Sequence, residues 1–364
     1  MRVLFLHSGR AWSGSARVFA SASRGLAARG HQVTFVCSPD SPVEQRLDYA
    51  AYEVLPIDLG VPWGIAAWHL RQVLTMRFVE VCFVHTEREQ LIVSAGSRMA
   101  ERAAIVRRIA PGSPAAVGRE GRLASRLALT GWMVELDEEV DAVPTRGARI
   151  ETVVVSPGVS VAAYDGIRPA LRAAVGIRRA ERLIACSYDP TSRIRAAVVL
   201  RTLAMLAPLH PELGVAFVGS GSDNEDLRMH AAALGITSRV SFLGERDDYL
   251  SVFRAADIGW VVSRGDDAVY GYLDLLALQV PVLAQRDVIA QRYVADGIAG
   301  LLLDPEDAHG TAAAVARLLA HDDQREAMGA AGRVRVAREF GEEAMVDGFE
   351  RAARNASDRT LWVR

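Results

Sequence analysis

The sequence contains no lysine, so all 42 of its basic residues are arginine. Cysteine is scarce: Cys37, Cys82 and Cys186 lie in or beside apolar runs, and an odd number of this kind indicates buried thiols rather than disulfides or a metal knuckle. No apolar run approaches the ~20 residues that span a bilayer, and the first run breaks at His7, too early for a signal peptide. These absences predict a cytoplasmic protein.

The charges nearly cancel, with 44 acidic and 42 basic residues and a net charge of -2. A near-neutral chain is not expected to bind nucleic acid, because such binding depends on neutralising phosphates. The length of 364 residues suits two domains, and a hydrophobic content of 50% allows each to bury a core.

Strand-like and helix-like runs alternate along the chain, a pattern typical of parallel sheets with crossover helices. The first series of strand-like runs covers residues 3–6, 32–37, 53–57, 81–85, 103–108, 132–136 and 152–159; the second covers 182–187, 214–222, 239–245, 258–263, 280–285 and 299–307. The pattern predicts two Rossmann-like domains, residues 1–158 and 159–338, joined by a linker-like tract at 160–181. Residues 324–356 are expected to form more than one helix, with the last segment, 339–364, packing back on the first domain.

Two aspartates, Asp266 and Asp274, stand eight positions apart before an apolar run. A carboxylate at the start of a helix can accept hydrogen bonds from a vicinal diol such as ribose, which is the role expected for Asp274. Asp266 is expected on the preceding loop, and the backbone N–H groups between the two could bind a phosphate. Taken alone, aspartates at this spacing are more often solvated loop and cap residues.

Glycine-bearing turns follow two of the predicted strands. Gly219 and Gly221 open a helix and could bring the backbone close to a ligand. The neighbouring residues 222–226 are equally typical of an N-cap with acids in the first turn, and this second interpretation is favoured. The turn ending at Gly14 lacks the full dinucleotide-binding spacing, so a simple tight turn is its alternative.

Four segments resemble, in order and spacing, the GT-B glycosyltransferases of family 4: VVVSPGVS at 153–160, residues 218–244, DDAVYGYLDLLALQVPVLA at 266–284, and AGLLLDPED at 299–307. The resemblance implies an α/β protein of GT-B fold, whose two domains face each other across a cleft. It also implies transfer of a sugar from a nucleotide diphosphate sugar to a hydroxyl acceptor, with retention of configuration and without a metal or other cofactor. The C-terminal domain would bind the donor and the N-terminal domain the acceptor.

The resemblance also assigns roles to particular residues. Asp266, Arg193 and His85 match catalytic positions, at the donor sugar, the diphosphate and a histidine near the sugar. The positions assigned to donor or nucleotide binding are Asp274, Gly14, Gly219, Gly221, Leu243, Gly244, Val269, Tyr270, Gly271 and Tyr188.

Several residues depart from the family pattern. Asp266 and Asp274 replace glutamates, Tyr188 stands where an arginine is usual, and Asp267 and Val269 replace glycines. The first alternative is therefore a catalytically degenerate GT-B protein acting as a binding or scaffolding module. A GT-B sugar-nucleotide epimerase is the second.

Arginines are concentrated in residues 98–126, where seven occur against two glutamates. Arg107 and Arg108 in this tract are predicted to bind an anionic, lipid-linked acceptor, or anionic lipid at the inner face of the membrane. A solvated helix face with a loop is the alternative, and it is slightly favoured.

Overall fold

The computed structural model describes residues 1–112, 118–141, 143, 152–177 and 181–357. The chain forms two compact units. The first unit comprises Met1–Gly158 together with the C-terminal segment that begins at Glu342, and the second unit comprises Val159–Gly341. The sequence prediction divides the chain at 158/159 and at 338/339, and it places residues 160–181 in a linker-like tract that here belongs to the second unit.

The first unit is built on a parallel sheet with the strand order β3-β2-β1-β4-β5-β6-β7. Its strands are β1 (Arg2–His7), β2 (Gln32–Cys37), β3 (Glu53–Pro56), β4 (Val81–Val84), β5 (Ala104–Arg108), β6 (Thr130–Val134) and β7 (Val153–Val154). Its helices are α1 (Gly14–Ala28), α2 (Pro42–Gln45), α3 (Trp63–Met76), α4 (Glu87–Ala100), α5 (Arg119–Leu127), the 3-10 turn η1 (Asp137–Glu139) and α13 (Glu342–Ser357). The strand expected at 132–136 is β6, which begins and ends two residues earlier. The strand expected at 152–159 is reduced to the two residues of β7.

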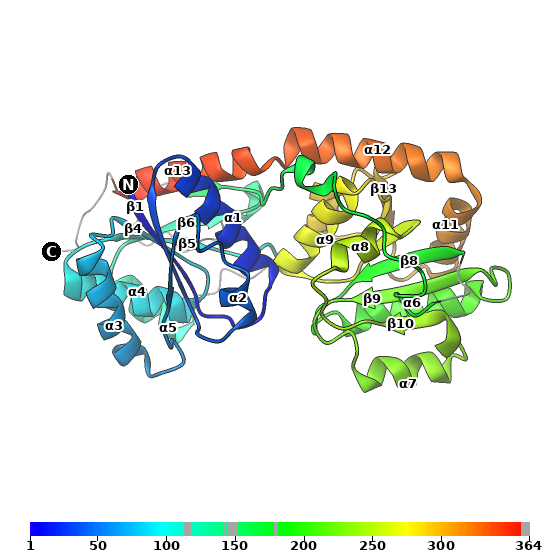
Figure 1. Cartoon of the computed structure of the whole chain (residues 1–364), viewed down its shortest axis with the longest axis horizontal. Coiled ribbons are helices and arrows are strands. Elements are labelled where there is room, and N and C mark those ends of the chain that lie inside the picture. Colours follow the sequence, from blue (N-terminus) through cyan, green and yellow to red (C-terminus); the bar gives the residue numbers. More distant parts are fainter. Residues whose placement is uncertain (113–117, 142, 144–151, 178–180, 358–364) are drawn as a thin grey trace. The chain divides into compact units, whose positions relative to one another are not determined.

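Helix α13 packs on the first unit, as the sequence predicted. Figure 1 shows it beside α1, and its Phe349 ring lies 5.2 Å from Phe83 of β4 and 5.8 Å from Phe5 of β1. A Cβ at Gly25 of α1 would lie 2.3 Å from Val346 of α13, so the glycine permits this close packing. The buried aromatic rings therefore join the C-terminal helix to the core of the first unit.

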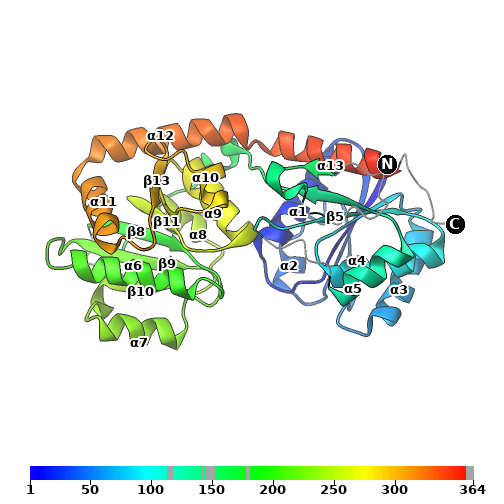
Figure 2. The same ribbon diagram turned by 180° about the vertical axis from the view of Figure 1, so that it is seen from behind.

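The second unit has a parallel sheet with the strand order β10-β9-β8-β11-β12-β13. Its strands are β8 (Arg182–Ser187), β9 (Leu213–Val218), β10 (Val240–Phe242), β11 (Ile258–Val261), β12 (Val282–Gln285) and β13 (Gly300–Leu303). Its helical segments are η2 (Val161–Tyr164), α6 (Arg193–Leu206), α7 (Glu225–Ala233), η3 (Thr237–Arg239), α8 (Tyr249–Arg254), α9 (Gly265–Ala277), α10 (Val288–Tyr293), α11 (Ala308–Ala320) and α12 (Asp322–Glu339). Figure 2 shows α6 alongside β9.

The core of the second unit explains why its strands read as continuous apolar runs. Side chains from α6 and α11 pack with the strand residues Phe217 and Trp260 in one buried cluster. Helix α9 contacts α12, where a Cβ at Gly332 would lie 2.6 Å from Leu276. Strands covered on both faces bury every side chain, which removes the alternation of polar and apolar residues.

Among the described residues, no helix combines the length and the apolar character needed to cross a membrane. Within the same residues, no group of three or more histidine, cysteine or acidic side chains is arranged to hold a metal ion.

Candidate functional site

The candidate site of the second unit lies where the strand order reverses. The chain runs outward from β8 through β9 to β10, then returns to the other side of β8 to build β11, β12 and β13. Ligands of open parallel sheets bind at the carboxyl ends of the strands on either side of such a reversal. Here those ends carry the β8–α6 and β11–α9 loops, and the hydroxyl oxygens of Ser187 and Ser263 lie 2.8 Å apart between them.

Asp189, which the sequence analysis did not single out, links these two loops. The side chain is only 6% exposed. Its Oδ1 accepts hydrogen bonds from the backbone N–H and the hydroxyl of Thr191 at 2.7 and 2.5 Å. Its Oδ2 accepts from the hydroxyl of Ser192 at 2.5 Å and from the N–H of Arg264 at 2.7 Å. The motif Asp-Pro-Thr-Ser directly after a predicted strand was the available signal, because Asp side chains in this position form local turns.

Arg193, which was predicted to bind the diphosphate, and its neighbours Tyr188 and Arg195 have separate surroundings. Arg193 begins α6, is 63% exposed, and forms an ion pair with Asp226 at 2.7 Å. Tyr188 is buried, which raises the pKa of its phenol, and its hydroxyl accepts a hydrogen bond from an amide side chain of the glycine turn. Arg195 points to the β11–α9 loop, where it donates to the carbonyl oxygen of Ser263 at 3.3 Å. Arg193 is therefore accessible to an anion, whereas Tyr188 is part of the core.

The two predicted aspartates both lie inside α9. The helix begins at Gly265, so Asp266 is in its first turn rather than on a preceding loop, and Asp274 is in its third turn rather than at its start. Both are buried, at 6% and 1% exposure. The carboxylate of Asp274 accepts hydrogen bonds from the hydroxyls of Tyr164 and Tyr249, the latter at 3.0 Å. In this structure the Asp274 carboxylate, which was predicted to bind a ribose diol, thus accepts hydrogen bonds from two phenol hydroxyls.

Beyond the first turn of α9, the residues between the two aspartates have their backbone N–H groups paired within the helix. Val269, Tyr270 and Gly271 lie inside α9, where each N–H donates to a carbonyl four residues earlier. This corrects the expectation that they line a phosphate site. Gly271 has a packing role instead, because a Cβ there would lie 2.9 Å from the hydroxyl of Ser187.

The glycine turn after β9 is a capping structure, as the favoured interpretation predicted. Asn224 accepts a hydrogen bond from the N–H of Leu227 at 3.0 Å and donates to the carbonyl of Gly221 at 2.6 Å. Gly219 and Gly221 have positive φ values of 131° and 73°. At Gly219 a Cβ would also lie 2.0 Å from the carbonyl oxygen of Tyr188, so no side chain fits there.

The segment after β10 is fixed against this turn. Leu243 donates its N–H to the carbonyl of Phe217 at 2.9 Å. Gly244 donates its N–H to the hydroxyl of Ser222 at 3.0 Å and accepts from the N–H of Gly219 at 2.9 Å. Leu243 and Gly244, which were predicted to contact the donor or its nucleotide, therefore lie on a segment held by hydrogen bonds to β9 and to the turn after it.

In the first unit, a buried glutamate holds two loops together. Glu89 of α4 accepts hydrogen bonds from the N–H and hydroxyl of Ser8 at 2.6 and 2.8 Å. It also accepts from the N–H groups of His85 and Thr86 at 2.8 and 2.9 Å. Burial favours a raised pKa for Glu89, but nearby His7 and His85 and the donated N–H groups outweigh it and hold the pKa below its usual value. The Thr-x-x-Glu capping box was a readable signal for this contact.

His7 is a further polar residue that the sequence analysis did not single out. It ends β1, is 4% exposed, and lies with Nε2 3.2 Å from the hydroxyl of Ser15. The rings of His7 and His85 are 6.4 Å apart. Gly14, a predicted donor contact, is the first residue of α1, whose N-cap is Ser13. The carboxyl ends of β1 and β4 thus bring two histidines and a serine hydroxyl together.

Arg107 and Arg108 do not form the predicted basic surface. Arg108 is 2% exposed and forms an ion pair at 3.5 Å with Glu135, which is 1% exposed. Arg107 donates to the side-chain oxygen of Gln90 at 3.0 Å and lies over the ring of Trp132 at 5.6 Å. Both belong to β5, an interior strand whose covered faces leave little room for exposed side chains. The exposed arginines of the tract are Arg98 on α4 and three residues of α5, Arg119, Arg122 and Arg126.

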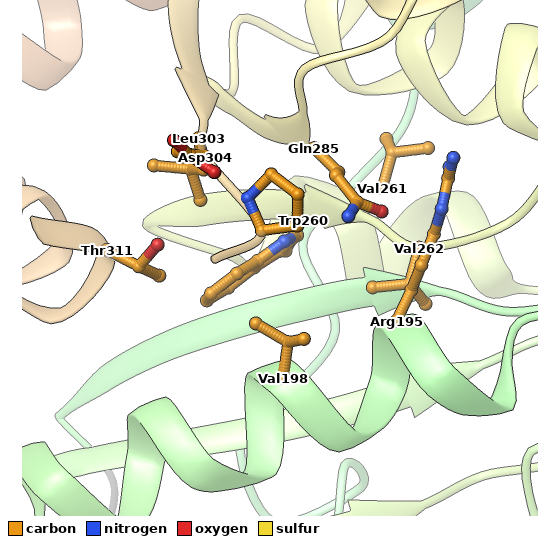
Figure 3. Close-up of a pocket in the computed structure, with 10 residues that line it drawn as sticks. Arg195, Val198, Trp260, Val261, Val262, Gln285, Leu303, Asp304 and Thr311 are labelled. Atoms are coloured by element: carbon orange, nitrogen blue, oxygen red, sulfur yellow. The ribbon is translucent and has the colours of Figure 1, made fainter. Parts of the chain in front are cut away.

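A small pocket lies beside the candidate site in the second unit. Figure 3 shows Trp260 between Val198 and Gln285, with Arg195 at one end and Thr311 at the other. Most of the lining is apolar, and Arg195 already forms an ion pair outside it, at 2.7 Å from an aspartate of the β12–α10 connection. No sequence pattern indicated this pocket.

Comparisons with known proteins agree with this architecture. Residues 169–335 match the family described as "Glycosyl transferases group 1". A D-inositol 3-phosphate glycosyltransferase of Mycolicibacterium gilvum (strain PYR-GCK) is 32% identical over 218 residues, covering 58% of this chain and 49% of that protein. The chain therefore spans about half the length of this relative.

Two solved structures share the fold over nearly the whole chain. Anabaena Alr3699/HepE, in complex with UDP-glucose, has a TM-score of 0.78 at 17% identity, covering 98% of this chain and 100% of that one. A glycosyltransferase from Rickettsia africae ESF-5 has a TM-score of 0.79 at 13% identity, covering 98% and 99%. At these identities the likeness shows the fold, which is that of GT-B glycosyltransferases.

Proposed function

We propose that this chain is a glycosyltransferase that moves a sugar from a nucleotide diphosphate sugar to a hydroxyl acceptor with retention of configuration. The observation that carries the proposal is the match of residues 169–335 to the group 1 glycosyl transferases. That stretch includes β8, β11 and α9, and so contains both loops of the candidate site. The neighbour in complex with UDP-glucose supports the choice of a nucleotide sugar as donor.

We assign donor binding to the second unit. Asp274 takes the ribose diol in place of its two tyrosine hydroxyls, and Asp266 contacts the donor sugar. Arg193 and the first turn of α6 stabilise the leaving diphosphate, since an exposed guanidinium and the N–H groups of a helix N-terminus both favour an anion. In this proposal the protein itself supplies the positive charge, without a metal.

The reaction is a displacement on one face of the sugar. The bond between C1 of the sugar and the diphosphate oxygen breaks, and that oxygen takes the bonding electrons. The acceptor oxygen bonds to C1 on the same face and transfers its proton to the leaving phosphate oxygen. Both partners stay on one face, so configuration at C1 is retained.

We assign acceptor binding to the first unit, at the carboxyl ends of β1 and β4. His85, His7 and Ser15 can exchange hydrogen bonds with a hydroxyl compound there. A lipid-linked anionic acceptor would meet the basic tract through the exposed arginines of α5, such as Arg119 and Arg126, since Arg107 and Arg108 are held inside the unit.

The proposal is tested by thermal unfolding of the wild type with UDP, GDP, ADP and their common sugars. A ligand at a hundred times its Kd stabilises the fold by about 2.7 kcal/mol, which is a measurable shift. Asp274→Asn should lose this shift. Asp257→Asn should keep it, because Asp257 binds the N–H of Leu183 at the opposite ends of β8 and β11.

Transfer is then followed by mass spectrometry with the stabilising donor and a panel of hydroxyl acceptors. Release of the nucleotide diphosphate with a glycosylated product supports the proposal. No stabilisation by any nucleotide at millimolar concentration would refute it. Binding without transfer or hydrolysis would indicate a protein that keeps the fold as a binding module.

A further inference from the structure

The carboxylate of Asp189 lies in the candidate site, between the loops that precede α6 and α9. It accepts two backbone N–H groups, from Thr191 and Arg264, and two hydroxyls, from Thr191 and Ser192. These donors come from both sides of the strand reversal, just before the N-termini of α6 and α9. Backbone N–H groups and hydroxyls at helix N-termini are the groups that bind phosphate oxygens in proteins.

The two helices are also left without side-chain caps. Within the described residues, neither Ser192 of α6 nor Arg264 of α9 forms an N-cap hydrogen bond to the first turn of its helix. The hydroxyl of Ser192 bonds to Asp189 instead. The first-turn N–H groups of an α-helix have no partner inside the helix, so both ends retain an attraction for an anion.

A nucleotide diphosphate at this position would meet the carboxylate as a like charge. The repulsion acts at short range and away from bulk water, where charges interact more strongly than on the surface. The diphosphate would also have to compete for the N–H and hydroxyl groups that donate hydrogen bonds to Asp189. Asp266 and Asp267 in the first turn of α9 add negative charge nearby, which Arg193 and Arg195 of α6 oppose.

We propose that Asp189 is a specificity-determining residue of the donor site, acting as a built-in anion that a donor diphosphate must displace. The inference rests on the proposed function, because it concerns the same site. It predicts that the wild type binds the diphosphate part of a donor weakly and selects donors whose base and sugar contacts compensate. Asp189 bridges the two loops when no donor is bound, and its side chain moves away from the diphosphate when a donor binds.

The test compares wild type, Asp189→Asn and Asp257→Asn by isothermal titration with UDP, ADP and the corresponding nucleosides, uridine and adenosine. Asp257 is the matched control, since its carboxylate also accepts a backbone N–H, from Leu183 at 2.7 Å, and lies at the opposite ends of β8 and β11. Asp189→Asn removes one negative charge next to the phosphates. It should tighten the Kd of the nucleoside diphosphates by about tenfold. The nucleosides should bind all three proteins alike.

The outcomes separate this inference from the proposed function. If the wild type binds a nucleoside diphosphate and Asp189→Asn binds it no more tightly, Asp189 is only a structural bridge and the inference is wrong. An equal gain in Asp257→Asn, or an equal gain for the nucleosides, would also overturn it, because the effect would then be general. If none of the proteins binds any nucleotide, the proposed function and the inference are both refuted.

Folding of the variants is checked by circular dichroism before titration. Asp189→Ser serves as a second variant, because its hydroxyl can still accept the N–H of Arg264 while the charge is gone. It should give the same gain as Asp189→Asn.

Discussion

Replacing Glu89 with glutamine tests whether one buried carboxylate holds the two loops of the first unit. Glu89→Gln keeps the size of the side chain and removes its charge. The glutamine oxygen can accept the hydrogen bonds of one carboxylate oxygen, for example those from Ser8. The amide nitrogen would then face the N–H groups of His85 and Thr86, and donors cannot pair with a donor.

The magnitude follows from the bonds that are lost. Two hydrogen bonds to a charged group contribute about 1.5–3 kcal/mol each, so the free energy of unfolding of the first unit should fall by about 3–6 kcal/mol. The pKa of Glu89 is held below 4.5 in the folded state. The stabilisation by its charge is therefore complete above the unfolded pKa and is lost as pH falls through the lower, folded pKa. The difference between wild type and variant should narrow below about pH 4.5.

The assay is urea unfolding combined with hydrogen exchange in peptides that cover β1 and β4, so that the first unit is measured by itself. Glu80→Gln is the control: Glu80 is exposed and accepts a single hydrogen bond, from the N–H of Arg2. It should change stability by less than about 1 kcal/mol. A loss of less than about 1 kcal/mol in Glu89→Gln, or a difference that does not narrow in acid, would refute the reasoning.

Three further predictions concern packing and charge. Gly219→Ala should lower the free energy of unfolding by more than about 2 kcal/mol in thermal unfolding, because its φ is positive and its Cβ would lie 2.0 Å from a backbone carbonyl oxygen. Gly235→Ala is the control and should lower it by less, because Gly235 also has a positive φ, 69°, but no atom lies within 4 Å of its Cβ position. Arg108→Ala should cost about 3–5 kcal/mol in urea unfolding by leaving Glu135 buried without this partner, and it should not alter binding to anionic vesicles. The three cysteines should not react with a thiol reagent in the native protein at about pH 8, because they are buried and burial raises the pKa of Cys37 to about 12; rapid native labelling would contradict this.

Sequence patterns predicted most of the architecture because strand and helix periodicity are local. The alternation of apolar runs and helical stretches gave two parallel sheets, and the amphipathic tract near the C-terminus gave α12 and α13. The error at α9 has a local cause. Asp266 was placed on a loop, yet the helix begins one residue earlier, at Gly265, whose φ of 55° is one that glycine adopts readily. Strand ends moved because pairing sets them: β6 ends at Val134, which pairs with Val154 of β7, and not at the later apolar residue Leu136.

The sequence by itself determined the fold class, the order of the strands along the chain and the capping turn at Asn224. Only the tertiary structure decided which polar side chains are accessible. The sequence suggests that Arg108 is a surface charge, but the interior position of β5 places it against Glu135. Asp274 was predicted to bind a ribose diol, and Asp189 was not singled out, because partners far away in sequence, Tyr164 and Arg264, complete their hydrogen bonding. Burial and hydrogen bonding depend on contacts between distant segments, and a local pattern contains no information about those contacts.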